Sequence, residues 1–179
     1  MSFDPIFVIA SAIPVAVILA SAASHKLRAP ARFADQLEDY QLLPRALVKP
    51  VSRGLPLVEL AIAFALLVPA SRPLAALLAA ALLALYAAAI GLNLWRGRRD
   101  IDCGCSGPDQ AQPLRPVLLA RNATLAGLAL VASLSPQARE LGLFDGFVVI
   151  AASATALLIY AAAEGLLANG PRLLKLIGR

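Results

Sequence analysis

Charged residues are scarce in this sequence. Asp, Glu, Lys and Arg make up 15% of its 179 residues, whereas about 25% is usual for a soluble domain. Hydrophobic residues account for 60%, even though Gly is left out of that count. This excess is too large for a water-exposed surface and excludes a soluble globular enzyme. Long polar tracts are also missing and the mean hydropathy is +0.77, which excludes a disordered chain.

The positive charge does not indicate a nucleic-acid partner. The formal net charge is +5, but Arg and Lys lie in short segments between apolar runs. Membrane proteins distribute their charge in this way. We therefore expect an integral membrane protein that is surrounded by lipid bilayer and binds no nucleic acid.

Five apolar runs approach the length of about 20 residues that a helix needs to cross ~30 Å of hydrocarbon. They are residues 5–24, 54–71, 73–95, 116–135 and 146–168. Asp4 followed by Pro5 is typical of a helix start. The runs predict a single all-α membrane domain over residues 1–179, with four core spans and a fifth, C-terminal span.

A polar stretch, residues 31–43, separates the first two runs. Phe33, Leu37 and Tyr40 recur there at helical spacing, and charges occupy the other side. This pattern predicts a short amphipathic helix on the membrane surface.

Lys and Arg are distributed unequally between the two sides of such a bundle. One side receives the N-terminus and the loops at 71–73 and 136–145, and it holds 2 of these residues, Arg72 and Arg139. The other side holds 13, and Arg121 lies inside a run, which accounts for all 16. The positive-inside rule then places the N-terminus outside and the 96–115 loop at the cytoplasmic face.

Cysteine is rare, and the two that are present, Cys103 and Cys105, are separated only by Gly104. A disulfide needs Cα atoms about 4.4–6.8 Å apart, and Gly permits the bend that brings them together. So small a ring should be strained, and strained, exposed disulfides exchange readily. The pattern favours a redox-active pair, with inert loop cysteines as the alternative.

A metal site is the competing interpretation of the two thiols. Structural zinc takes four ligands, and the one histidine, His25, is distant in the sequence. A metal would need ligands from a second chain, so we expect none.

Polar side chains in or near the runs gather toward the end that carries the cysteine loop. They are His25, Lys26, Glu59, Asn93, Arg121, Asn122 and Glu164. Ionisable groups within a membrane are costly and indicate a partner or a function, although charges near helix ends can also extend to the headgroups. Glu59 and Arg121 each lie about one helical turn from the end of their run, and we expect them to pair.

These motifs resemble the methylamine utilisation protein MauE family. The resemblance rests on the Cys-Gly-Cys-x-Gly loop, Arg121-Asn122, Glu59 after Pro56, and His25-Lys26-Leu27 followed by Tyr40 and Leu43-Pro44. It implies a DoxX-like four-helix bundle in a bacterial inner membrane, with the fifth span outside that bundle. It also implies a redox-associated protein that matures the disulfide-rich small subunit of methylamine dehydrogenase.

The leading hypothesis is thiol–disulfide exchange in protein maturation, with Cys103 and Cys105 as the catalytic pair. It implies a thioredoxin-like partner and a disulfide-containing client. The family places that client in the periplasm, whereas the charge distribution places the pair at the cytoplasmic face. Three explanations stay open: a quinone carries the electrons onward, the loop is reached through the bundle, or the pair serves a cytoplasmic partner.

Two other hypotheses remain. One is a non-catalytic membrane subunit that docks a thioredoxin-like protein. The other is a bundle that binds a quinone or another small molecule in the polar cluster.

Overall fold

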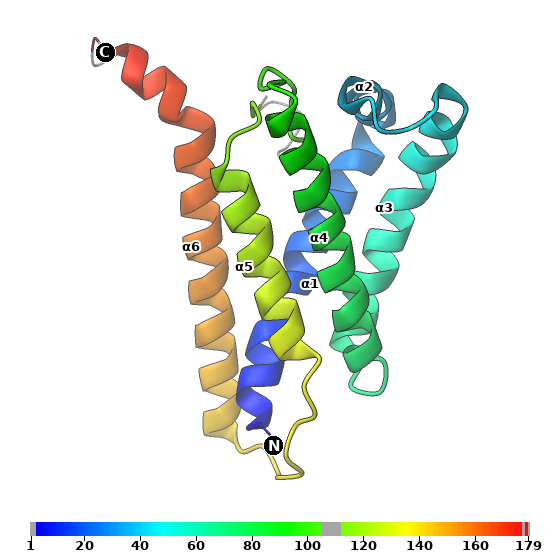
Figure 1. Cartoon of the computed structure of the whole chain (residues 1–179). Coiled ribbons are helices and arrows are strands. Elements are labelled where there is room, and N and C mark those ends of the chain that lie inside the picture. The colour runs from blue at the N-terminus through cyan, green and yellow to red at the C-terminus, as the bar shows by residue number, and fades with distance from the viewer. Residues whose placement is uncertain (1–2, 105–111, 177, 179) are drawn as a thin grey trace.

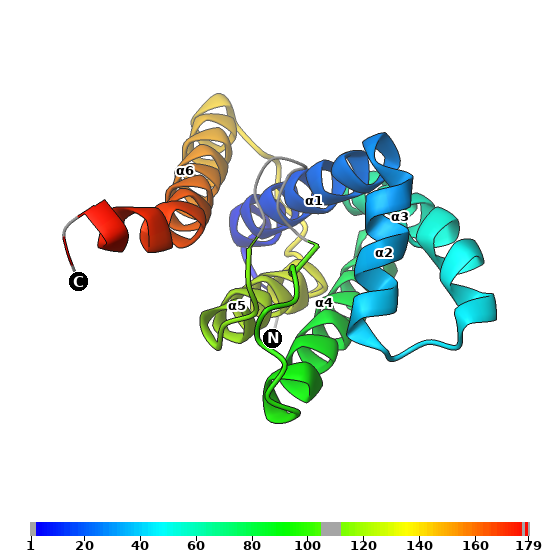
Figure 2. The same cartoon turned by 90° about the horizontal axis from the view of Figure 1, so that it is seen from above.

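Six α-helices make up most of the described part of the chain in this computed structural model. The structure describes residues 3–104, 112–176 and 178, with backbone alone over 170–176. The helices are α1 (Pro5–Arg28), α2 (Pro30–Tyr40), α3 (Arg45–Leu67), α4 (Arg72–Trp95), α5 (Val117–Ala132) and α6 (Leu143–Leu176). Five of them run alternately up and down, and the short α2 lies across one end of the bundle (Figures 1 and 2). The expected all-α class is confirmed.

Four of the described helices, α1, α3, α4 and α6, are long and apolar enough to cross a membrane by length and composition. The fourth expected span is shorter than predicted, since α5 has 16 residues and ends at Ala132. The helix α3 begins at Arg45 rather than at residue 54. Its first turns carry exposed charges, so hydropathy marks the apolar part of the helix and misses its polar beginning.

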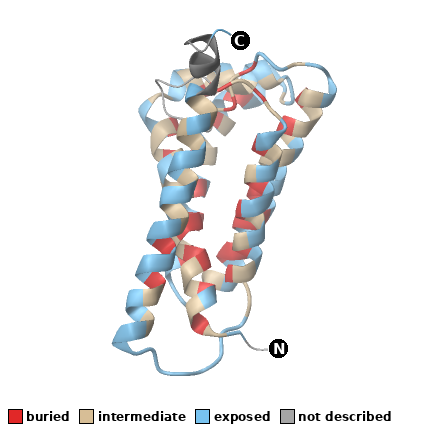
Figure 3. Cartoon of the chain, turned by 90° about the vertical axis from the view of Figure 1, so that its left-hand side faces the viewer, coloured by how far each residue is buried: buried red, intermediate tan, exposed pale blue. Residues whose placement is uncertain are grey.

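Small residues allow the helices to pack closely. Ala79 on α4 and Ala129 on α5 are fully buried in the core, together with Leu66 of α3. Figure 3 shows that buried residues lie on the inward sides of the helices and exposed residues on the outward sides. Large apolar side chains cover those outward sides; Phe64 and Ile150, for example, are 67% and 69% exposed. A surface of this kind is suited to lipid.

The helix α1 is the centre of the bundle and packs against α3, α5 and α6, whereas α4 packs against α3 and α5. Asp4 caps α1 by accepting a hydrogen bond from the Ile6 N–H at 2.9 Å, as the Asp4-Pro5 pair predicts. Arg139, in the α5–α6 connection, forms ion pairs with Asp4 and Asp145. These contacts lie at the end that holds the N-terminus, opposite the cysteine loop (Figure 1).

Candidate functional site

The loop between α4 and α5 brings Cys103 back over the end of the bundle. The Cys103 N–H donates to the Gln112 carbonyl at 2.9 Å, and the Leu114 N–H donates to the Ile101 carbonyl at 3.2 Å. These bonds hold the two arms of the loop together. Cys103 is 6% exposed and packs in an apolar cluster that includes Ile90, Ile101, Leu114 and Leu118. Cys105 lies outside the described residues.

Asp102 fixes the loop to α2. Its Oδ2 accepts hydrogen bonds from Arg32 Nη2 and Gln36 Nε2, both at 2.8 Å, and its Oδ1 accepts from the Gln112 N–H at 3.1 Å. In addition, the Tyr40 hydroxyl donates to the Cys103 carbonyl at 3.2 Å. The short helix is therefore attached directly to the cysteine loop. The sequence did not predict this contact of Asp102, because Arg32 and Gln36 lie far from it in the chain.

Gly104 provides the backbone bend that the sequence predicts. Its φ of +73° is a left-handed conformation that L side chains rarely adopt. A Cβ at this position would lie 2.9 Å from Gln36 Oε1 on α2. Glycine is thus required for the turn, whereas the Gln36 amide stands at the end of a flexible side chain that can shift.

Arg121 of α5 lies against the sulfur of Cys103. Its Nη2 is 3.6 Å from Cys103 Sγ, and its Nη1 donates to Glu164 Oε1 of α6 at 2.7 Å. The Arg121 and Glu164 side chains are 9% and 17% exposed. A cation this close to a sulfur favours the thiolate over the thiol.

A second buried ion pair lies beneath α2. Lys26 Nζ of α1 donates to Glu59 Oε1 of α3, and the Tyr86 hydroxyl of α4 donates to the same oxygen at 2.5 Å. Lys26 Nζ also lies 5.2 Å from the centre of the Phe33 ring and 5.0 Å from that of Tyr86. Within the described residues, Glu59 Oε2 has no hydrogen-bond partner. Each of these two buried groups therefore has a partner of opposite formal charge.

The expected pair between Glu59 and Arg121 is wrong. Glu59 binds Lys26, and Arg121 binds Glu164. In the described bundle α3 and α5 are not neighbours, because α1 and α4 pack against both of them. Each charge is instead paired with an opposite charge on another helix, Glu59 with α1 and Arg121 with α6.

The other predicted polar residues have separate surroundings. Asn93 is fully buried and its Nδ2 donates to the Ala89 carbonyl at 3.0 Å, within α4. Asn122 is 2% exposed, and its Nδ2 has no hydrogen-bond partner among the described residues. His25 Nε2 lies 3.4 Å from Ser21 Oγ on the same helix. The structure brings Cys103 and Arg121 together, and it brings Lys26 and Glu59 together. These two pairs lie apart from each other at the end of the bundle that carries the cysteine loop.

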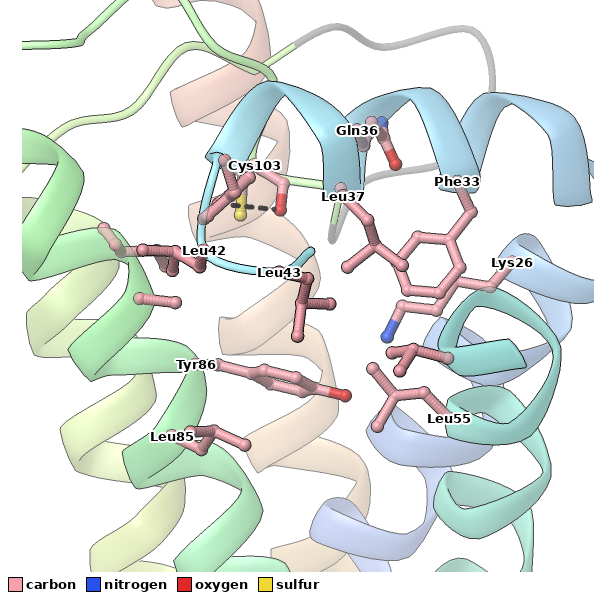
Figure 4. A pocket seen from close by; sticks show the side chains of 15 residues that line it. Lys26, Phe33, Gln36, Leu37, Leu42, Leu43, Leu55, Leu85, Tyr86 and Cys103 are labelled. Carbon is pink, nitrogen blue, oxygen red and sulfur yellow. Dashed lines mark hydrogen bonds between the residues drawn. The ribbon is translucent and has the colours of Figure 1, made fainter. Parts of the chain in front are cut away.

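A cavity of about 360 Å³ lies between α2, α3 and α4, and we call it the α2 cavity. Lys26, Phe33, Tyr40, Tyr86 and Cys103 contribute to its wall, which is otherwise almost entirely apolar. Figure 4 shows the Lys26 ammonium and the Tyr86 hydroxyl pointing toward one another, with Cys103 lying apart from them near α2. The hypothesis of a small-molecule pocket in the polar cluster did not predict this wall. Of that cluster only Lys26 lines the cavity among the described residues, and the wall combines five separate segments of the chain.

The chain is similar in sequence to one family of known proteins. The family model of the methylamine utilisation protein MauE matches residues 4–135. A methylamine utilization protein MauE from Methylophilus methylotrophus is 39% identical over 163 residues, which cover 90% of this chain and 86% of the relative. The MauE protein of Paracoccus denitrificans is 39% identical over 162 residues, covering 90% and 87%. That of Methylorubrum extorquens is 42% identical over 150 residues, covering 82% and 80%. No solved structure matches.

The helices and their lipid-suited surface, together with these relatives, define a multi-pass membrane protein that carries a cysteine loop at one end. The chain belongs to the MauE family, whose members take part in methylamine utilisation. A match that covers 90% of the chain extends past residue 135 into α6. The relatives therefore share part of the helix that supplies Glu164.

Proposed function

We propose that the protein carries out thiol–disulfide exchange through Cys103 and Cys105 in the maturation of a disulfide-containing protein of methylamine utilisation. The observation that carries the proposal is the Arg121 guanidinium 3.6 Å from Cys103 Sγ. The thiolate is the nucleophile in disulfide exchange, and low-pKa cysteines next to cations are the reactive ones. A cysteine that only fills space in the core needs no arginine beside it.

The bonds, electrons and protons of the exchange balance between the client and the cysteine pair alone. A client thiolate attacks one sulfur of the Cys103–Cys105 disulfide and forms a mixed disulfide, and the second client thiol then displaces the protein's cysteine. The client disulfide forms, and the pair keeps two electrons and two protons as a dithiol. Because Cys103 is 6% exposed, we assign the contact with the client to Cys105 and the inner position to Cys103.

The proposed location of the cysteine loop follows from the distribution of Lys and Arg residues. The loop lies at the end that holds 13 of the 16 Lys and Arg residues, so we assign it to the cytoplasmic face of a bacterial inner membrane. A thioredoxin-like protein is the proposed partner on that side. The exchange reaction would make the protein a thiol–disulfide oxidoreductase.

Growth on methylamine tests this function. A host whose own gene is deleted is complemented with the wild-type protein, Cys103→Ser, Cys105→Ser or the neighbouring control Ser106→Ala. We expect both cysteine variants to abolish growth on methylamine while growth on a multicarbon substrate and the amount of protein in the membrane stay normal. Full growth of both cysteine variants would contradict the proposal and favour the docking subunit.

A further inference from the structure

We propose that the α2 cavity binds a lipid-soluble quinone, which takes two electrons and two protons from the Cys103–Cys105 dithiol. This inference rests on the proposed function and deepens it, because it names the chemical class of electron acceptor that restores the disulfide. The size, the wall and the position of the cavity support it.

The cavity has the size and polarity of a site for an apolar ring. Its volume of about 360 Å³ lies in the range of about 300–1,000 Å³ that is usual for small-molecule sites. Apolar side chains supply most of the wall: Leu37, Leu42, Leu43, Val51, Leu55 and Leu85. A charged metabolite would lose its hydration there without enough partners, whereas a quinone ring would not.

The polar part of the wall matches the carbonyl oxygens of a quinone. An ammonium group has three N–H donors, and Lys26 donates one of them to Glu59. Its other N–H groups are able to donate to a carbonyl oxygen in the cavity. The positive charge also stabilises the negative charge that develops on that oxygen during reduction. The rings of Phe33 and Tyr86 beside Lys26 offer flat surfaces for contact with the ligand.

Cys103, one of the two thiols of the proposed electron donor, lies in the same wall. Cys103 and Gly104 line the α2 cavity, and Arg121 contacts the Cys103 sulfur. A ligand in the cavity therefore meets Cys103 of the proposed pair without opening the bundle. In the reaction two S–H bonds break, one S–S bond forms, and the quinone gains two O–H bonds as the quinol. Electrons and protons balance between these two reactants.

The cavity also reaches the lipid-facing surface. Leu85 of α4 lines it and is 62% exposed, and Leu42 lines it and is 37% exposed. In a membrane these side chains meet lipid, so a lipid-soluble molecule has direct access from the bilayer. A phospholipid acyl chain has the same access but would use neither the Lys26 ammonium nor the sulfur, and we therefore favour the quinone.

The test uses the full-length protein, reduced, in nanodiscs and without oxygen. Decyl-ubiquinone is added, and the quinol formed is compared with the thiols lost. We expect one quinol for each dithiol oxidised. Ala89→Trp places a large ring in the cavity wall and should lower the rate at least tenfold. The matched control, Ala88→Trp, lies on the exposed side of α4 and should react like the wild type.

A second measurement does not depend on a variant. A photoreactive azidoquinone is bound to the wild-type protein, irradiated, and the labelled peptides are identified by mass spectrometry. We expect labels in α2, α3 and α4 around the cavity, and excess decyl-ubiquinone should remove them. Labels confined to outward-facing residues, or a phospholipid retained in the cavity in place of the quinone, would overturn the inference.

A glutathione titration separates the absence of a quinone site from the absence of thiol exchange. The same preparation is equilibrated with reduced and oxidised glutathione. Cysteines that cycle with glutathione but reduce no quinone would refute the quinone site and leave thiol exchange intact. Cysteines with no reversible couple would refute the proposed function itself.

Discussion

The guanidinium of Arg121 lies against the sulfur of Cys103, with 3.6 Å between Nη2 and Sγ. Glu164 of α6 holds the other arm of the same guanidinium at 2.7 Å. Because Arg121 comes from α5 and Glu164 from α6, the last helix helps to position a positive charge beside the cysteine loop. This helix therefore contributes to the site, although the MauE family model ends at residue 135.

Replacement of Arg121 by Gln should make Cys103 less reactive. Loss of the neighbouring cation disfavours the thiolate, and one pKa unit corresponds to about a tenfold change in the thiolate fraction. We expect iodoacetamide to alkylate Cys103 about tenfold more slowly near neutral pH when Cys105→Ser is also present. Arg115→Gln, in the same loop, is the control and should keep the original rate. Equal rates for all three proteins would show that Arg121 has no effect on the thiol.

The Lys26–Glu59 pair predicts that a single variant loses much more stability than the double variant. Glu59→Gln leaves a buried ammonium without its counter-ion, and breaking a buried pair in this way costs about 3–5 kcal/mol. Lys26→Met combined with Glu59→Leu removes both charges and should restore most of the stability. The exposed Lys49→Met is the control. Thermal unfolding in detergent measures the effect, and a double variant as unstable as Glu59→Gln would contradict it.

The sidedness of the cysteine loop is testable in whole cells. The 13-to-2 distribution of Lys and Arg predicts that a membrane-impermeant maleimide does not label Cys103 or Cys105 when the outer barrier is open and disulfides are reduced. A cysteine introduced in place of Gln137, at the opposite end, should be labelled under the same conditions. Labelling of the native pair without lysis would reverse the orientation and would place the exchange in the periplasm.

The stability of the protein should depend on pH through Asp4, which lies at the end of the bundle opposite the cysteine loop. Hydrogen bonds from Arg139, followed by one from the Ile6 N–H, lower the pKa of Asp4 below its ordinary value of 3.8. The Asp4 carboxylate therefore contributes stability above that value, and the contribution is lost as the pH falls through the lowered pKa.

Asp4→Asn keeps a capping acceptor but removes the charge, so its Tm should lie below that of the wild type near neutral pH. This difference should shrink as the pH falls from neutral to below 3.8. The exposed Asp39→Asn is the control. The same difference in Tm at both pH values would show that the Asp4 charge does not stabilise the protein.

The sequence predicts the helices better than it predicts their contacts. Apolar runs and the Asp4-Pro5 start indicate where most spanning helices lie, because hydropathy and capping are local properties. The beginning of α3 was missed since its first turns are polar, and Arg45 begins a helix that extends beyond the apolar run.

Side-chain partners depend on which helices are neighbours, and that information is not local. The gathering of Lys26, Glu59 and Arg121 at one end was visible from their distances to the ends of the apolar runs. Their pairing was not, because nothing in the sequence states that α1 and α4 lie between α3 and α5. The role of Asp102 was hidden for the same reason, since its partners Arg32 and Gln36 are on α2, far away in the sequence.

We propose that Cys103 and Cys105 form one reversible redox pair. The most direct measurement titrates native membranes with glutathione redox buffers and modifies free thiols with a maleimide that adds mass. We expect both cysteines to change state together in a single reversible two-electron transition. Arg121→Gln should move the midpoint of this transition toward a more reducing potential, because the thiolate loses its cation. Thiols that remain reduced or remain oxidised across the whole range, or that are modified one at a time, would contradict it.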